Sequence, residues 1–318
     1  MKNIKHSIVI VSFNQEKYIV NAIKSIFDQQ LEPYELIVLD DCSTDGTAKV
    51  AHELIESYNP SFKCRVIINE RNLGIPKNMK KAAEVSSGNV FSLLAADDIF
   101  LPNATRCVKN AIQKAGLDPD HDVFVCFSPS LNMDADGKNQ VLANYKIYRQ
   151  SPFQTMIRKC APFGKIGFSR SSIINVDYPD DIGIWADWAW DISICNQANS
   201  YYVINEICYI HYAKIGVSSK TANAEIDDSY LKVTIYLMNK YKNSLSFFDR
   251  IYLEGERAYL SWKINRGFLT LVKSILFTLV NIFNSGSLSS SKSLASRFLH
   301  SNLINAFRKS KEILKLLI

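Results

Sequence analysis

Short apolar runs alternate with longer amphipathic stretches along the first 130 residues. Runs rich in Val, Ile and Leu are typical of buried strands. They lie at residues 8–12, 34–39, 65–68, 89–95 and 122–127. The intervening stretches predict helices at residues 15–30, 45–58 and 76–85, and from Pro102 onward. This alternation predicts βαβ units, and therefore an α/β fold whose mostly parallel sheet is covered by helices on both faces.

The rest of the chain follows a different pattern. Aromatic residues, glycines and short polar segments at residues 140–225 predict a mixed region packed beside the sheet. From about residue 226 the pattern is helical to the end, with a Ser- and Gly-rich joint at 285–291.

Polar and aromatic residues follow three of the predicted strands. Ser12, Phe13 and Asn14 end the first strand, Asp40 and Asp41 end the second, and Asp97 and Asp98 end the fourth. Because ligands bind at the carboxyl edge of parallel strands, these residues are expected to share one site.

The adjacent Asp97 and Asp98 admit two interpretations. Paired carboxylates after a buried strand are costly unless a cation neutralises them, and oxygen ligands suit Mg²⁺ or Mn²⁺. Alternatively, Asp98 acts as a cap ahead of the helix at Pro102. Asp41 can likewise accept a hydrogen bond from a nucleotide or stabilise a turn. Phe13 can stack on a base or pack in the core.

Four segments, in their order and spacing, resemble the family 2 glycosyltransferases of GT-A fold. They are residues 7–14 (SIVIVSFN), 35–47 (ELIVLDDCSTDGT), 69–74 (NERNLG) and 87–98 (SGNVFSLLAADD). The resemblance covers about residues 5–215. It implies a GT-A domain at 1–225 with a C-terminal helical extension at 226–318. It also implies a hexosyltransferase-type enzyme that moves a sugar from a nucleotide-diphosphate donor, with UDP-sugars favoured, and inverts the anomeric carbon.

The resemblance also implies roles for individual residues. Phe13 would lie on the nucleobase, Asp41 would accept from it, Asp40 would support that loop, and Asp97 would bind Mn²⁺ or Mg²⁺ on the diphosphate. The expected donor-binding set is Ser12, Phe13, Asn14, Asp40, Asp41, Asn72, Gly74, Asp98 and His211. His211 is a second candidate metal ligand or phosphate donor, with a purely structural histidine as the alternative. The chain departs from the family at Ala95, where an acidic ribose contact is expected and is missing, and metal dependence remains the expectation.

The segment around Asp187 provides the candidate general base. Inverting transfer needs one base on the acceptor hydroxyl. Family members carry an acidic pair here, but this chain has Ala186 before Asp187. Neighbouring tryptophans are expected to desolvate Asp187 and raise its pKa. Asp191, four residues on, is the second candidate, and a helix-capping aspartate is the structural alternative.

Charge is uneven along the chain and bears on location. The formal net charge is +6, and the last 70 residues carry 11 Lys and Arg against 4 Asp and Glu. Leu303 and Phe307 recur at helical spacing beside Arg308 and Lys309. A basic amphipathic helix suits an anionic membrane surface, whereas packing on the domain or on a second subunit is the alternative.

The composition sets the remaining expectations. No secretory signal or membrane-spanning run is found, and seven dispersed cysteines without a CxxC motif predict reduced thiols. We therefore expect a cytoplasmic protein, peripheral at the inner face of the cell membrane. It would act on a glycan or lipid-linked acceptor in bacterial surface polysaccharide assembly, with a homo-oligomer possible and no nucleic-acid partner. The competing class is a non-catalytic scaffold subunit, favoured by Ala95 and Ala186.

Overall fold

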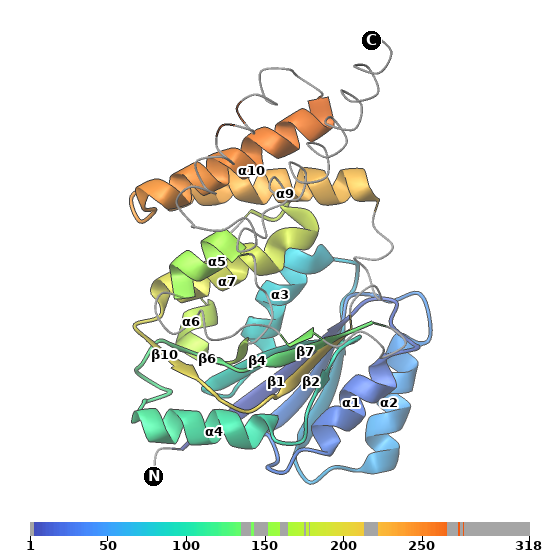
Figure 1. Ribbon diagram of the computed structural model, residues 1–318. Coiled ribbons are helices and arrows are strands. Elements are labelled where there is room, and N and C mark those ends of the chain that lie inside the picture. The colour runs from blue at the N-terminus through green and yellow to red at the C-terminus, as the bar shows by residue number, and fades with distance from the viewer. Residues whose placement is uncertain are drawn as a thin grey trace, which may run out of the picture. The chain divides into compact units, whose positions relative to one another are not determined.

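Figure 1 shows the computed structural model of the chain. It describes residues 3–134, 141–142, 152–159, 165–174, 176–177, 179–212 and 222–265, together with residues 273 and 276. The chain divides into two compact units, residues 1–153 with 161–221, and residues 154–160 with 222–318.

A seven-stranded sheet forms the centre of the first unit, in the order β10-β6-β9-β4-β1-β2-β3. Its strands are β1 (His6–Ser12), β2 (Glu35–Asp40), β3 (Lys63–Ile68), β4 (Val90–Ala95), β6 (Phe124–Phe127), β9 (Lys165–Ser169) and β10 (Ser200–Val203). The strands are parallel except β9, which runs antiparallel to β4 and β6. The predicted α/β fold with a mostly parallel sheet is confirmed.

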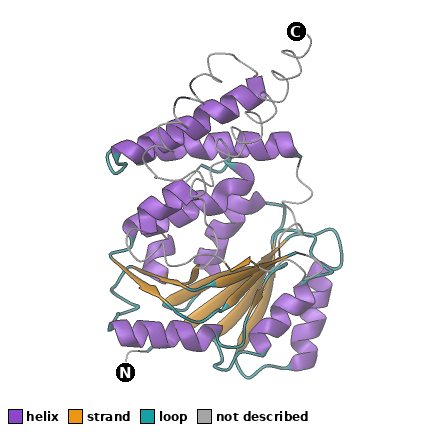
Figure 2. Cartoon of the chain, in the orientation of Figure 1, coloured by secondary structure: helices purple, strands orange, loops and turns teal. Residues whose placement is uncertain are grey.

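Helices cover both faces of this sheet, as Figures 1 and 2 show. One face carries α1 (Ile19–Phe27), α2 (Thr47–Tyr58) and α4 (Ala104–Ala115), and the other carries α3 (Gly74–Val85), α6 (Arg170–Ile174) and α7 (Ala186–Gln197). A 3₁₀ turn at Gly183–Trp185 leads into α7. On α1, five apolar residues at helical spacing share one face and are buried: Ile19, Ala22, Ile23, Ile26 and Phe27.

A second, four-stranded sheet has the order β5-β11-β7-β8. Its strands are β5 (Ile99–Phe100), β7 (Ser130–Met133), β8 (Val141–Leu142) and β11 (Tyr209–Tyr212). Because β5 follows Asp97 and Asp98 directly and pairs with β11, this sheet brings residues near 210 to the end of β4.

The structure corrects the prediction for residues 140–225, because β9 and β10 lie within the main sheet and not beside it. Strand β9 is short and contains Gly167, which weakens its sequence signal. A Cβ at Gly167 would lie 2.9 Å from Val108 of α4, so the close helix packing requires glycine.

Helix starts differ from the predicted ones by two to four residues. Asn14 adopts φ 52°, and the carbonyl of Gln15 accepts from the amides of Tyr18 and Ile19, so a turn precedes α1. Helix α4 begins at Ala104 and not at Pro102. These turns place the loop residues at the sheet edge.

The second unit contains α9 (Asn223–Lys240), α10 (Phe247–Asn265) and most of α5 (Pro152–Lys159). Buried Tyr230 donates to Glu256 over 3.2 Å, and Lys263 lies 2.6 Å from Asp227, so polar pairs join α9 to α10. Among the described helices, none combines the length and apolarity needed to cross a membrane. The predicted amphipathic segment near Leu303 lies outside the described residues.

Candidate functional site

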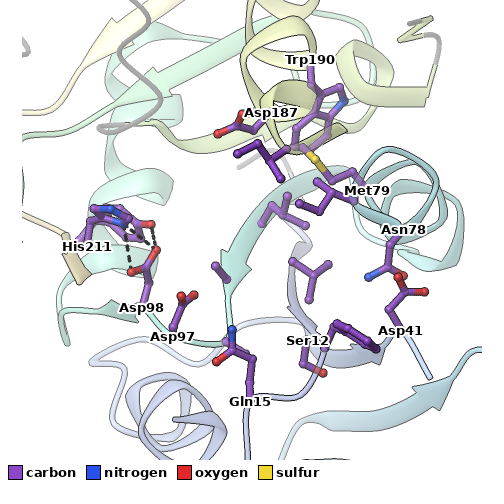
Figure 3. Close-up of a pocket in the computed structure, with 18 of the residues that line it drawn as sticks. Ser12, Gln15, Asp41, Asn78, Met79, Asp97, Asp98, Asp187, Trp190 and His211 are labelled. Atoms are coloured by element: carbon purple, nitrogen blue, oxygen red, sulfur yellow. Dashed lines mark hydrogen bonds and ion pairs between the residues drawn. The ribbon is translucent and has the colours of Figure 1, made fainter. Parts of the chain in front are cut away.

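A cavity of about 300 Å³ opens at the carboxyl ends of β1, β2 and β4 (Figure 3). The chain runs from β1 to β2 and β3 on one side of the sheet and returns to β4 on the other. This is the topological switch point, where open α/β sheets bind ligands. The register aligns Ser12 with Asp40 and Val11 with Ala95, so the three strands end together.

Most of the residues predicted for the site line this cavity. They are Ser12, Phe13, Asp41, Asp97, Asp98, Asp187 and His211. Asn14, Asp40, Asn72, Gly74 and Asp191 are not part of its lining. The assigned roles of both groups stay predictions, and the contacts of each residue show what it holds in place.

Asp41 anchors the start of α3 while lining the cavity. Its Oδ1 accepts from the Leu73 amide at 2.8 Å and from Asn69 Nδ2 at 2.7 Å, and its Oδ2 accepts from the Gly74 amide at 2.9 Å. An ionised carboxylate offers about four acceptor positions. Asp41 therefore retains capacity for one further donor, on a side chain whose position is fixed.

Asp40 and Asn14 tie together the loops beneath the cavity. Buried Asp40 accepts from Ser12 Oγ at 2.9 Å and from Ser43 Oγ at 2.6 Å. Asn14 donates its amide N–H to Ser43 Oγ, and its Oδ1 accepts from the Thr44 amide at 2.8 Å. Both residues thus connect the β1–α1 loop to the β2–α2 loop and position Ser12 and Phe13.

Asn72 and Gly74 shape the turn into α3. Asn72 Oδ1 accepts from the Gly74 amide at 2.9 Å, the same N–H that Asp41 binds. Gly74 adopts φ 77°, a left-handed conformation that favours glycine. The turn presents its amides to Asp41 and not to the cavity.

The two carboxylates after β4 have different environments. Asp98 is buried and accepts from Tyr209 Oη and, at 2.9 Å, from the Tyr212 amide, and it lies 3.1 Å from His211 Nδ1. Burial, and then the adjacent charge of Asp98, raise the pKa of Asp97 to about 6. Asp97 thus carries a poorly compensated negative charge at the cavity wall.

His211 is the basic residue in this group. Burial by itself lowers the pKa of His211, but the hydrogen bond and charge of Asp98, followed by the charges of Asp97 and Asp187, raise it above the usual value. Tyr209 and His211 are two residues apart on β11, so their side chains lie on the same face of the strand, the one that faces Asp98.

Asp187 lies across the cavity from Asp97 and His211, beside Trp190 (Figure 3). It occupies the first turn of α7, where the helix dipole favours a carboxylate, and its Oδ1 accepts from the Trp188 amide at 2.7 Å. Asp191 is buried one turn later and does not line the cavity. The geometry therefore favours Asp187 over Asp191 as the group that meets a substrate.

The side chains at the cavity supply some of the ligands that a divalent cation needs. Asp97 provides a hard oxygen ligand at a point of excess negative charge, as Mg²⁺ and Mn²⁺ prefer. Within the described residues, no three His, Cys, Asp or Glu side chains are arranged to hold a metal by themselves. Mg²⁺ commonly binds through one or two carboxylates plus substrate phosphates, and this site fits that pattern.

The sequence reasoning missed several lining residues, including Gln15, Ile75, Asn78 and Met79. The last three share one face of α3 at spacings of three and four, a signal that was available. Asn78 accepts from Asn69 Nδ2, the same group that donates to Asp41, so this face extends the Asp41 cluster. No pattern in the sequence identifies Gln15.

Comparisons with known sequences bear on this site. Residues 7–175 match the sequence model of "Glycosyl transferase family 2". The putative teichuronic acid biosynthesis glycosyltransferase TuaG of Bacillus subtilis is 32% identical over 93 residues, which are 29% of this chain and 35% of TuaG. Seven other curated relatives are matched over 28–46% of their own length, so the chain spans less than half of each.

Solved structures share the fold at low sequence identity. The Staphylococcus aureus TarS 1–349 complex with UDP has a TM-score of 0.56 and 16% identity, covering 82% of this chain and 73% of that one. The mannosyltransferase PcManGT of Pyrobaculum calidifontis, in complex with GDP-Man and Mn²⁺, has a TM-score of 0.57 and 14% identity. The match covers 96% of this chain and 81% of PcManGT.

Proposed function

Because the chain belongs to glycosyl transferase family 2 and is a glycosyltransferase, we propose that it performs an inverting transfer of a sugar from a nucleoside diphosphate. UDP-sugars are the favoured donors, and a glycan or lipid-linked molecule of a bacterial surface polysaccharide is the acceptor. The observation that carries the proposal is a single cavity at the switch point that collects Phe13, Asp41, Asp97 and Asp187.

The nucleotide occupies the end of the cavity nearest β2. Phe13 is half-buried there and offers a ring to the base, while Asp41 keeps one acceptor position for a base N–H. The diphosphate then extends toward Asp97. Structures of similar fold that were solved with UDP and with GDP-Man support a nucleotide donor.

Asp97, with His211 as a further candidate, would hold Mn²⁺ or Mg²⁺ on the diphosphate. The cation would supply charge neutralisation to the leaving nucleotide. Three partners, Tyr209, His211 and the Tyr212 amide, surround Asp98, which leaves one of its roughly four acceptor positions for the substrate. Asp98 also positions His211 beside Asp97.

Asp187 takes the proton of the acceptor hydroxyl. That oxygen forms the new bond to the anomeric carbon as the bond to the diphosphate breaks on the opposite face, which inverts the configuration. The placement of Asp187 across the cavity from Asp97 supports this in-line geometry (Figure 3). Asp191 remains the alternative base, but its buried position outside the lining disfavours it.

The proposed location is the inner face of the cytoplasmic membrane. The excess of Lys and Arg after residue 249 supports attraction to an anionic surface, and the relative TuaG is named for teichuronic acid biosynthesis. A homo-oligomer stays a prediction.

A second candidate function is a scaffold subunit that keeps the fold without catalysis. Ala95 and Ala186, at positions where the resemblance implies acidic residues, favour it. A thermal-shift screen of the full chain against UDP-, GDP-, dTDP- and CMP-sugars, with and without Mn²⁺, separates the two. A ligand at 100 times its Kd adds about 2.7 kcal/mol of stability. A metal-dependent shift with one nucleotide supports the transferase, and no shift with any of them contradicts it.

A further inference from the structure

Gln15 is a buried residue whose side-chain oxygen has no protein partner. The residue is 6% exposed and lines the cavity, and its Oε1 is buried without a hydrogen bond. Its backbone is fixed, because its amide donates to Thr47 Oγ1 at 2.8 Å and its carbonyl accepts from Tyr18 and Ile19. Buried polar atoms are almost always paired. Because Gln15 lines the cavity, a ligand bound there can supply the donor that this oxygen lacks.

Gln29 provides the comparison within the same chain. It is 8% exposed, but its Nε2 donates to the carbonyls of Ser25 and Leu101, and its Oε1 accepts from the amide and hydroxyl of Thr105. A structural glutamine in this protein is therefore fully bonded. Gln15 departs from that pattern at the cavity wall.

The position of Gln15 specifies which part of a ligand it would meet. Figure 3 shows it between Ser12 and Asp41 on one side and Asp97 on the other. If the base lies at Asp41 and the diphosphate at Asp97, the ribose lies between them. Ala95, at the neighbouring strand end, offers only a methyl group there.

We propose that the Gln15 side-chain amide binds a ribose hydroxyl of the nucleotide donor. A ribose hydroxyl donates to the buried Oε1, which gives one hydrogen bond between the side chain and the nucleotide. This inference rests on the proposed function and adds to it a residue that recognises the ribose.

The test compares the full-length wild type with Gln15→Met, Gln15→Ala and the control Gln29→Met. Each protein is titrated calorimetrically with UDP in MnCl₂, and then with 2′-deoxy-UDP and 3′-deoxy-UDP. GDP and its deoxy analogues replace them if the wild type prefers guanine. Met preserves the length and packing of Gln15, and Ala checks that the result does not depend on that choice.

We expect both Gln15 variants to bind UDP about 3- to 10-fold more weakly, the range for one lost hydrogen bond. They should match the wild type for the analogue that lacks the contacted hydroxyl. The melting temperature of Gln15→Met should stay near the wild-type value, because the packing is kept and no protein hydrogen bond of Oε1 is lost. Gln29→Met should melt several degrees lower and keep its UDP affinity.

Unchanged UDP affinity in the Gln15 variants would overturn the inference, as would an equal loss for UDP and both deoxy analogues. If the wild type binds neither UDP nor GDP, the proposed function fails first, and this inference fails with it.

Discussion

The Asp98 carboxylate lies 3.1 Å from Nδ1 of His211 and joins the end of β4 to β11. It also accepts from Tyr209 and from the Tyr212 amide. Asp98→Asn turns one acceptor oxygen into a donor that faces other donors. We expect a loss of about 1–3 kcal/mol in the free energy of unfolding, measured by urea titration. Unchanged stability would show that β11 is held in place by other contacts.

Asp97→Asn should have the opposite effect on the ligand-free protein. Burial and Asp98 disfavour the charge of Asp97, whose pKa rises to about 6 in the folded chain. Ionised Asp97 therefore costs stability at pH 7. We expect the neutral variant to have a free energy of unfolding at least about 1 kcal/mol higher than the wild type, measured by urea titration.

The same Asp97→Asn substitution should remove the Mn²⁺-dependent part of UDP binding, a loss of tenfold or more by calorimetry. Asp98→Asn is the matched control for the stability measurement, because the same substitution at the adjacent carboxylate should lower stability. A destabilised Asp97→Asn protein, or one that keeps its metal response, would contradict the role assigned to this carboxylate.

His6 makes stability depend on pH at a place far from the site. Ser92 donates to the carbonyl of Ile166, so its oxygen accepts from His6 Nε2, which must carry the proton of the neutral ring. Burial lowers the pKa of His6 to about 4. Below pH 6.5 the unfolded chain takes up a proton that the native chain excludes.

Stability should therefore fall by up to about 3 kcal/mol between pH 6.5 and 4, and level off below. His6→Gln keeps the donor but does not titrate. The difference between the two urea stability curves isolates the His6 contribution from the carboxylates that titrate nearby. Parallel curves over this pH range would refute the prediction.

The sequence was sufficient to predict the parallel strands and the shared edge, because both depend on local periodicity. Residues 8–11 and 36–39 are continuously apolar, as is typical of strands buried on both faces. The insertion of β9 was not predictable, because its pairing with β4 and β6 joins residues more than 35 positions apart.

The sequence predicts which residues belong to the site better than it predicts which groups each of them contacts. Asp41 and Asp97 follow strands directly, so topology alone brings them to one cavity. Whether Asp40 faces a ligand or the hydroxyls of Ser12 and Ser43 depends on the tertiary contacts of the loops. The same holds for Gln15, whose lack of a partner is visible only in the folded chain.

The most direct test of the account is the turnover of the nucleotide sugar that stabilises the protein. Release of the nucleoside diphosphate is measured for the wild type, Asp187→Asn and Asp191→Asn, together with UDP affinity. A general base contributes about 10²–10⁴-fold, so we expect Asp187→Asn to lose at least a hundredfold in turnover with unchanged UDP binding. Asp191→Asn should retain most of its turnover. If Asp187→Asn keeps more than a tenth of the wild-type rate, Asp187 is not the base, and the chemistry assigned to this cavity is wrong.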